Sequence, residues 1–152
     1  MAHLTVDTSR LPVVVLDLNG NYSEAQAEQF CAEMRAVLER RKRIAIVADA
    51  RKAGMSSLKA RSVMRQFTTD TMHLSDAYTA CTAVIINSAI VRMGVSAMFH
   101  LTKPNFPIKV FKTPEEGIEW TLQFLSMEIG APEDARVEEG EDLFIGGAPP
   151  EA

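Results

Sequence analysis

The sequence contains few of the residues from which disulfide scaffolds and metal sites are built. There are two cysteines and three histidines among 152 residues. Cys31 and Cys81 each lie inside an apolar stretch, which is typical of buried, reduced thiols rather than of a disulfide, redox pair or zinc site. The histidines show no metal-ligand spacing and no obvious partner acid or nucleophile. We therefore expect no metal and no cofactor.

The sequence also lacks long apolar runs. None approaches the roughly 18 residues of a membrane-spanning helix, and the start, MAHLTVDTSR, lacks the charged and apolar regions of a signal peptide. We expect no membrane insertion and a cytoplasmic location. With 47% hydrophobic residues, the chain is long enough to bury the core of one domain.

Acidic charge is concentrated near the end of the chain. The net charge is −4, but residues 131–152 carry seven acids and one base, a subtotal of −6, which leaves residues 1–130 at +2. The pattern predicts an α/β domain over 1–130, slightly basic, and an acidic C-terminal tail over 131–152. The tail contains an apolar triplet, Leu143-Phe144-Ile145, in a composition otherwise typical of disorder.

Periodicity predicts strands that alternate with helices. Ser23 and the pair Ser56-Ser57 can each cap a helix, and Pro114 suits the first turn of the last one. This alternation predicts an α/β fold with a four- to five-stranded, mostly parallel sheet covered by about four helices. The predicted strands are 3–7, 12–20, 44–50, 81–88 and 107–112, and the predicted helices begin near 23, 57, 89 and 114.

Three short segments carry a family resemblance. They are the Gly20-Asn21-Tyr22-Ser23 turn, Asp49 at the end of IAIVAD, and FKTPEEGIEWTL with Phe111, Glu116 and Trp120. Over residues 3–125 the chain resembles the SpoIIAA/STAS-like group, including its SEC14-like branch. The resemblance implies a compact β-α superhelix and protein-protein switching of the kind found in anti-sigma antagonists. The SEC14-like comparison implies binding of an apolar ligand.

The same resemblance suggests phosphorylation at the start of the second helix. Anti-sigma antagonists are switched by phosphorylation of a serine there, in an Asp-Ser-Ser-Gly-like context. The corresponding stretch here is Gly54-Met55-Ser56-Ser57-Leu58, which lacks the preceding Asp and the following Gly. Ser56 and Ser57 are therefore candidate phosphorylation sites, with simple helix capping as the alternative.

A run of basic residues surrounds this helix start. Between Asp49 and Asp70 the bases are Arg51, Lys52, Lys59, Arg61 and Arg65, and no acid intervenes. Such a surface could receive an acidic or phosphorylated protein partner, or the chain's own tail, or it could be a solvated face. A second basic cluster, Arg40–Arg43, is interpreted as a solvated helix end. No aromatic residues alternate with these charges, so we do not expect nucleic-acid binding.

Two further segments are candidates for contacts between molecules. Residues 89–101 are apolar nearly all round, which indicates either a buried helix or a helix that meets a partner, such as a second copy. Leu143, Phe144 and Ile145 could dock in a groove or add a strand to a sheet edge, in the same chain or in another.

The main enzymatic alternative is a haloacid-dehalogenase-like phosphatase. VVVLDLNG resembles that family's first motif and would make Asp17 the nucleophile, but Asn19 cannot serve as the acid that the chemistry needs two residues later. Asp17 and Asp49 could together hold a cation at the carboxyl edge of the sheet, although such aspartates more often accept turn amides. We therefore expect no enzymatic activity.

The sequence favours a non-enzymatic, regulatory protein-interaction module. It would bind its partner through the loop and helix around 51–65. The alternative is a carrier of an apolar small molecule, for which flexible side chains could line the pocket. Those residues are Met64, Phe67, Met93, Met98 and Phe99.

Overall fold

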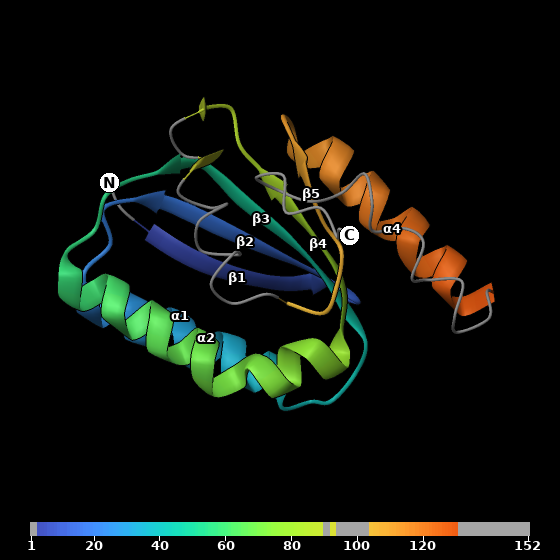
Figure 1. Cartoon of the computed structure of the whole chain (residues 1–152), viewed down its shortest axis with the longest axis horizontal. Coiled ribbons are helices and arrows are strands. Elements are labelled where there is room, and N and C mark those ends of the chain that lie inside the picture. Colours follow the sequence, from blue (N-terminus) through green and yellow to red (C-terminus); the bar gives the residue numbers. More distant parts are fainter. Residues whose placement is uncertain (1–2, 90–91, 94–103, 131–152) are drawn as a thin grey trace.

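The computed structural model of the chain describes residues 3–89, 92–93 and 104–130. They form five strands and three long helices (Figure 1). In chain order these are β1 (His3–Arg10), β2 (Val13–Gly20), α1 (Glu24–Leu38), β3 (Ile44–Ala53), α2 (Leu58–Tyr78), β4 (Thr79–Ile85), β5 (Ile108–Phe111) and α4 (Pro114–Gly130).

The strands make one sheet in the order β1-β2-β3-β4-β5. β1 pairs antiparallel with β2, and every later pair is parallel. Parallel neighbours require crossover connections, which α1 and α2 supply between β2, β3 and β4. The predicted four- to five-stranded, mostly parallel sheet is confirmed, with five strands.

Several predicted strand boundaries are wrong, and the error at the end of β3 moves two functional candidates. β3 does not end at Ala50 but continues to Ala53. An irregularity in the β2–β3 register after Asp17 lets Asn19 pair with Lys52 and Gly20 with Ala53. Arg51 and Lys52 therefore lie in a strand and not in a loop. Similarly, α2 runs without a loop into β4, which begins at Thr79 rather than 81 and ends at Ile85 rather than 88.

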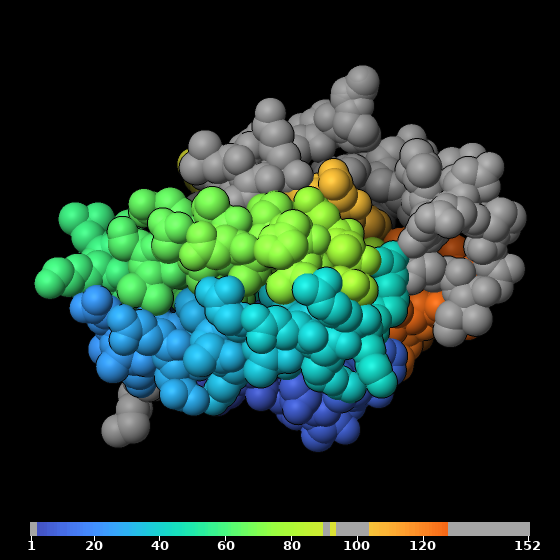
Figure 2. Space-filling view, turned by 90° about the horizontal axis from the view of Figure 1, so that it is seen from below, coloured from blue at the N-terminus to red at the C-terminus, as the bar shows by residue number. Residues whose placement is uncertain are grey.

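Helices α1 and α2 lie side by side over one face of the sheet (Figures 1 and 2). α1 begins with a capping box, because Ser23 Oγ accepts from the Gln26 amide at 3.1 Å and Gln26 Oε1 accepts from the Ser23 amide at 2.8 Å. The predicted cap at Ser23 is confirmed. The core under this pair contains the following buried residues: Val14, Leu16, Phe30, Cys31, Met34, Val37, Leu38, Ile44 and Leu74.

Helix α4 covers the opposite face (Figure 1). It begins at Pro114, as predicted, and Thr113 Oγ1 accepts from the Glu116 amide at 3.3 Å. Gly117 lets the helix approach the sheet closely, because a Cβ there would lie 2.8 Å from Ile85 Cδ1 and 3.2 Å from Ala83 Cβ. Its packing is completed by the rings of Phe111, Trp120 and Phe124, whose neighbouring centroids are 5.7 and 5.6 Å apart.

Cys31 and Cys81 are both buried and form no disulfide, as predicted. Of the predicted helix over 89–101, only residues 89, 92 and 93 are described, and they are helical. The remainder of that segment, and Leu143, Phe144 and Ile145 in the tail, lie outside the described residues. No helix within the described residues is long and apolar enough to cross a membrane.

The close approach of α4 generates a stability prediction. We expect Gly117→Val to lower the free energy of unfolding by about 2 kcal/mol, because the added atoms meet buried Ile85 and Ala83. Urea denaturation measures the change. Glu119→Val places the same side chain at an exposed position of α4. It should lower the free energy of unfolding by only about 0.5 kcal/mol, because valine has a lower helix propensity than glutamate. Equal losses in the two variants would contradict this packing.

Candidate functional site

Two loops are tied together at the carboxyl end of the parallel strands. The Gly54 amide donates to Gly20 O at 3.1 Å, and the Tyr22 amide donates to Ser56 Oγ at 3.0 Å. Gly54 also packs too closely for a side chain, since a Cβ there would lie 2.0 Å from Asn21 Oδ1. The loop before α2 is therefore positioned by the turn before α1.

The two candidate serines have different environments. Ser56 is 4% exposed, and its hydroxyl accepts the hydrogen bond from the Tyr22 amide. Ser57 is exposed and caps α2, because its Oγ accepts from the Ala60 amide at 3.1 Å. A kinase could reach Ser57 in this conformation, whereas Ser56 would first have to leave its buried position.

Two large apolar side chains project into solvent beside these serines. Met55 is 75% exposed and Leu58 is 73% exposed. Sequence reasoning missed both residues, although Leu58 carried a detectable signal. It lies two residues before buried Ala60, about 200° around the helix, and therefore falls outside the apolar stripe of α2.

The structure separates the five basic residues that the sequence grouped. Arg51 pairs with Asp49 within β3, while Lys59, Arg61 and Arg65 are exposed on α2. Arg61 Nε donates to Ser56 O at 3.0 Å and so braces the loop. We use the name α2-start surface for these exposed residues of the loop and helix: Met55, Leu58, Lys59, Arg61 and Arg65.

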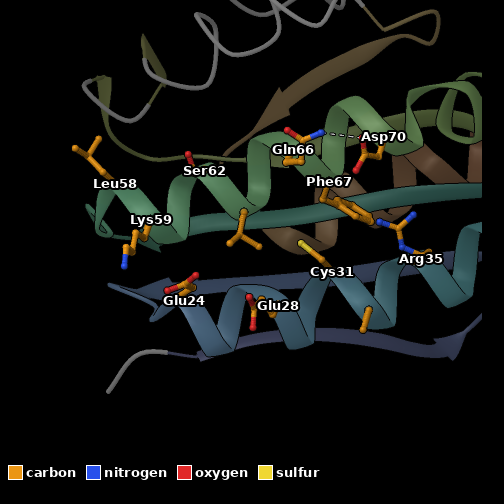
Figure 3. A pocket seen from close by; sticks show the side chains of 12 residues that line it. Glu24, Glu28, Cys31, Arg35, Leu58, Lys59, Ser62, Gln66, Phe67 and Asp70 are labelled. Carbon is orange, nitrogen blue, oxygen red and sulfur yellow. Dashed lines mark hydrogen bonds between the residues drawn. The ribbon is translucent and has the colours of Figure 1, made fainter.

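An open groove runs between α1 and α2 and begins at this surface (Figure 3). Leu58 and Lys59 lie near one end of it, opposite Glu24 on α1. Its lining combines apolar and charged side chains of both helices: Glu24, Glu28, Cys31, Ala32, Arg35, Leu58, Lys59, Ser62, Val63, Gln66, Phe67 and Asp70.

Contacts between the helices hold the floor of the groove. The Arg35 guanidinium carbon lies 5.4 Å from the centroid of the Phe67 ring, and Cys31 Sγ lies 3.7 Å from Met64 Sδ. Burial raises the pKa of the Cys31 thiol, so the side chain stays protonated near neutral pH. These contacts give the groove a packed floor, while charged side chains of both helices line its walls.

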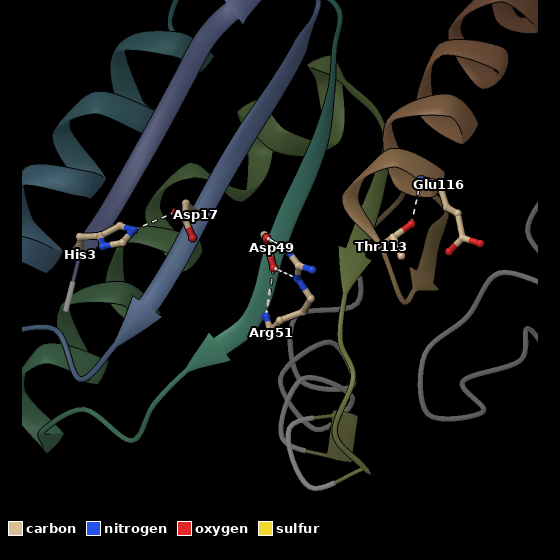
Figure 4. Close-up of polar contacts among 6 residues, drawn as sticks. All are labelled: His3, Asp17, Asp49, Arg51, Thr113 and Glu116. Atoms are coloured by element: carbon tan, nitrogen blue, oxygen red, sulfur yellow. Dashed lines mark hydrogen bonds and ion pairs between the residues drawn. The ribbon is translucent and has the colours of Figure 1, made fainter. Parts of the chain in front are cut away.

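Asp17 and Asp49 are register neighbours on β2 and β3, and the structure gives each carboxylate a partner (Figure 4). His3 Nε2 lies 2.8 Å from Asp17 Oδ2. Arg51 donates to Asp49 through Nε and Nη2 at 2.9 and 2.8 Å, and its amide donates to Asp49 Oδ1 at 3.2 Å. Within the described part of the chain, no three His, Cys, Asp or Glu side chains are grouped to hold a metal ion.

Arg51 also sets the ionisation of Asp49. Its hydrogen bonds lower the pKa of the Asp49 carboxyl, and this effect exceeds the opposing effect of burial. Because Arg51 forms a two-pronged ion pair on the α4 side of the sheet, it does not belong to the α2-start surface.

Comparison with known proteins gives a family and a fold. The family model described as "Domain of unknown function (DUF7793)" matches residues 18–125. No curated protein matches the chain. A crystal structure of an uncharacterized DUF3478-family protein with a SpoIIAA-like fold, from Shewanella loihica PV-4, is similar with a TM-score of 0.65. The likeness covers 80% of this chain and 95% of that chain at 13% identity, which confirms the predicted SpoIIAA-like fold and nothing beyond the fold.

The serine environments generate a paired prediction. We expect Ser57→Asp to change the free energy of unfolding by no more than about 0.5 kcal/mol, because aspartate also caps helices and its charge suits a helix N-terminus. Ser56→Asp should cost about 2 kcal/mol or more, because it places a carboxylate in a buried site. Thermal and urea unfolding measure both variants. If Ser57→Asp is destabilised and Ser56→Asp is as stable as wild type, the assignment of Ser56 as the buried serine and Ser57 as the exposed one is wrong.

The Asp49–Arg51 pair generates a pH prediction. Since the folded-state pKa of Asp49 is lowered, its ionised form stabilises the fold above the unfolded pKa, and this contribution disappears as pH falls through the folded pKa. Asp49→Asn should therefore cost about 1 kcal/mol at pH 7 and progressively less in acid. Urea unfolding from pH 7 to pH about 3 tests this.

Glu119→Gln removes a carboxylate from an exposed position of α4 and serves as the control for that series. The claim that the Asp49–Arg51 ion pair stabilises the fold is wrong if Asp49→Asn is as stable as wild type at pH 7. It is also wrong if the loss in the free energy of unfolding is the same at both ends of the pH range.

Proposed function

The chain belongs to the DUF7793 family of domains, and we propose that it is a non-enzymatic regulatory module that binds a protein partner through the α2-start surface. The observation that carries this proposal is the pair of exposed side chains, Met55 and Leu58. Large apolar groups cost free energy in water, and adjacent ones on a soluble domain mark sites where another molecule excludes that water.

The position of these side chains also supports binding. Hydrogen bonds from Gly54 and Tyr22 hold the loop in place, and the Ser57 cap fixes the start of α2. A preformed surface loses little conformational entropy on binding, which favours affinity. Met55 adds a flexible side chain that can adapt to a partner, and Leu58 adds a better-defined apolar anchor.

The surrounding charges suggest the chemistry of the partner. Arg61 and Arg65 lie one turn apart on α2 and are exposed, while the groove beside them has Glu24 and Glu28 on its α1 wall. A partner that carries acidic side chains next to an apolar one would match Leu58 and the two arginines. An amphipathic helix that lies along the groove would present these groups at the required spacing.

The two alternative functions receive less support from the described residues. A carrier needs an enclosed apolar chamber, whereas this groove is open and lined in part by Glu28, Arg35 and Asp70. For a phosphatase, Asp17 would have to act as a free nucleophile, yet it contacts His3. A magnesium-dependent phosphatase assay with a generic phosphate ester addresses that alternative, and we expect no turnover above buffer.

A quantitative affinity experiment tests the proposed interface. Tagged full-length protein serves as bait, recovered proteins are identified by mass spectrometry, and the leading one is purified and titrated by calorimetry. We expect Leu58→Glu to weaken binding by roughly 100-fold, as loss of an apolar anchor does at interface hot spots. Arg61→Glu/Arg65→Glu should also weaken it, with a strong dependence on salt.

Leu122→Glu is the matched control, because Leu122 is also a large exposed apolar residue but lies on α4. This variant should bind as wild type does. If Leu122→Glu abolishes binding while Leu58→Glu leaves it intact, the partner binds to α4 and the proposal is wrong.

A further inference from the structure

The amino end of the parallel strands carries a cluster of cations. Arg40, Arg41 and Lys42 follow α1 and are exposed, and Arg10 is exposed at the end of β1, next to the turn that leads into β2. Leu11, beside Arg10, is an exposed apolar side chain at 40%. We call these five residues the basic end. In Figure 2 the loop after α1 and the turn after β1 meet at one end of the molecule.

The backbone of this loop has an unusual feature. Arg41 has a φ of 55°, in the left-handed region that glycine adopts more readily than any other residue. A position that favours glycine instead carries a guanidinium group. Helices commonly end in a residue of this conformation, and the Arg41 amide donates to the carbonyl oxygen of Leu38, the last residue of α1, at 3.1 Å.

Helix α4 brings the acidic tail to the same end. Near its start, Gly117 packs on Val47, Ala83 and Ile85, and near its end Phe124 and Leu125 pack in the cluster that contains Val13 and Ala45, at the amino ends of β2 and β3. The chain therefore leaves α4 at the amino end of the strands, on the opposite face of the sheet from α1, and Figure 1 shows the end of α4 and the loop after α1 both toward the right. The α2-start surface lies at the opposite end of the strands.

The tail and the basic end are complementary in chemistry as well as in position. Residues 138–145, EEGEDLFI, place four acids directly before Leu143, Phe144 and Ile145. The basic end offers four exposed cations and the exposed apolar side chain of Leu11. Attraction between exposed charges of opposite sign is modest for one pair but accumulates over several pairs at low ionic strength.

We infer that the acidic tail binds in cis to the basic end of its own domain. Residues 131–152 are joined to the end of α4, and a random coil of that length spans about 25 Å on average, so the covalent link holds the acids near the cations at a high effective concentration. The tail neutralises the cations there and leaves the α2-start surface, at the other end, available to a partner. This inference does not depend on the proposed function.

Carbodiimide cross-linking of the full-length protein tests the inference, because the reagent joins an amine to a carboxylate only when the two are in contact. Trypsin releases the tail as residues 137–152, and Lys42 supplies an amine in the basic end. We expect the tail to be joined to Lys42 in the monomer fraction. The yield should fall about fivefold or more in 1 M salt, which reduces the Debye length to about 3 Å.

Variants and mixed isotopes provide the controls. Arg40→Gln/Arg41→Gly should reduce the Lys42 link, and glycine suits the positive φ at 41, so folding is preserved. Arg61→Gln/Arg65→Gln removes two charges from the opposite end and should leave the link unchanged. The inference is overturned if the tail is joined mainly to Lys52 or Lys59, or to no lysine. Links that join ¹⁴N chains to ¹⁵N chains would also overturn it, because the tail would then bind a second copy.

Discussion

The parallel pairing of β2 with β3 is the interaction on which the remainder of the structure depends. Several of its residues, among them Val13, Val14, Ala45 and Val47, are almost fully buried between the two helical layers. The same pairing brings Gly20 beside Ala53 at the carboxyl end. The turns that follow are then close enough to exchange the hydrogen bonds that position α2. The proposed interface therefore originates in the register of two buried strands.

The fold separates two kinds of surface along the strand axis. The α2-start surface, which combines exposed apolar and basic side chains, lies at the carboxyl end, where α2 begins, and the basic end lies at the amino end, where α1 ends and α4 finishes. A parallel βα arrangement has this consequence because every helix that follows a strand starts at one end of the sheet and returns to the other. Two binding events at opposite ends would not compete sterically.

Sequence reasoning was most successful where the signal was local. The caps at Ser23 and Ser57 and the first-turn proline at Pro114 are all predicted by residue type and position. The buried strands are predicted by their β-branched runs, and the SpoIIAA-like fold by the resemblance that three short segments carry. These features depend on residues within a few positions of one another, so one sequence is sufficient to predict them.

The candidate site was less predictable because it depends on contacts between distant segments. A local irregularity in the β2–β3 register extends β3, so Arg51 meets Asp49 and not a partner surface. The Ser56 hydroxyl accepts a hydrogen bond from the amide of Tyr22, which lies 34 positions earlier in the chain. The groove exists only because α1 and α2 pack together. Neither propensity nor spacing along the sequence contains this information.

Hydrogen–deuterium exchange of the full-length protein with and without its recovered partner is the most direct measurement of the central claim. We expect binding to slow exchange at the loop and first turns of α2, over residues 55–65, and in the facing first turns of α1. Exchange on α4 should be unchanged. Protection confined to α4, with residues 55–65 exchanging as they do in the free protein, would contradict the claim that the start of α2 is the binding surface.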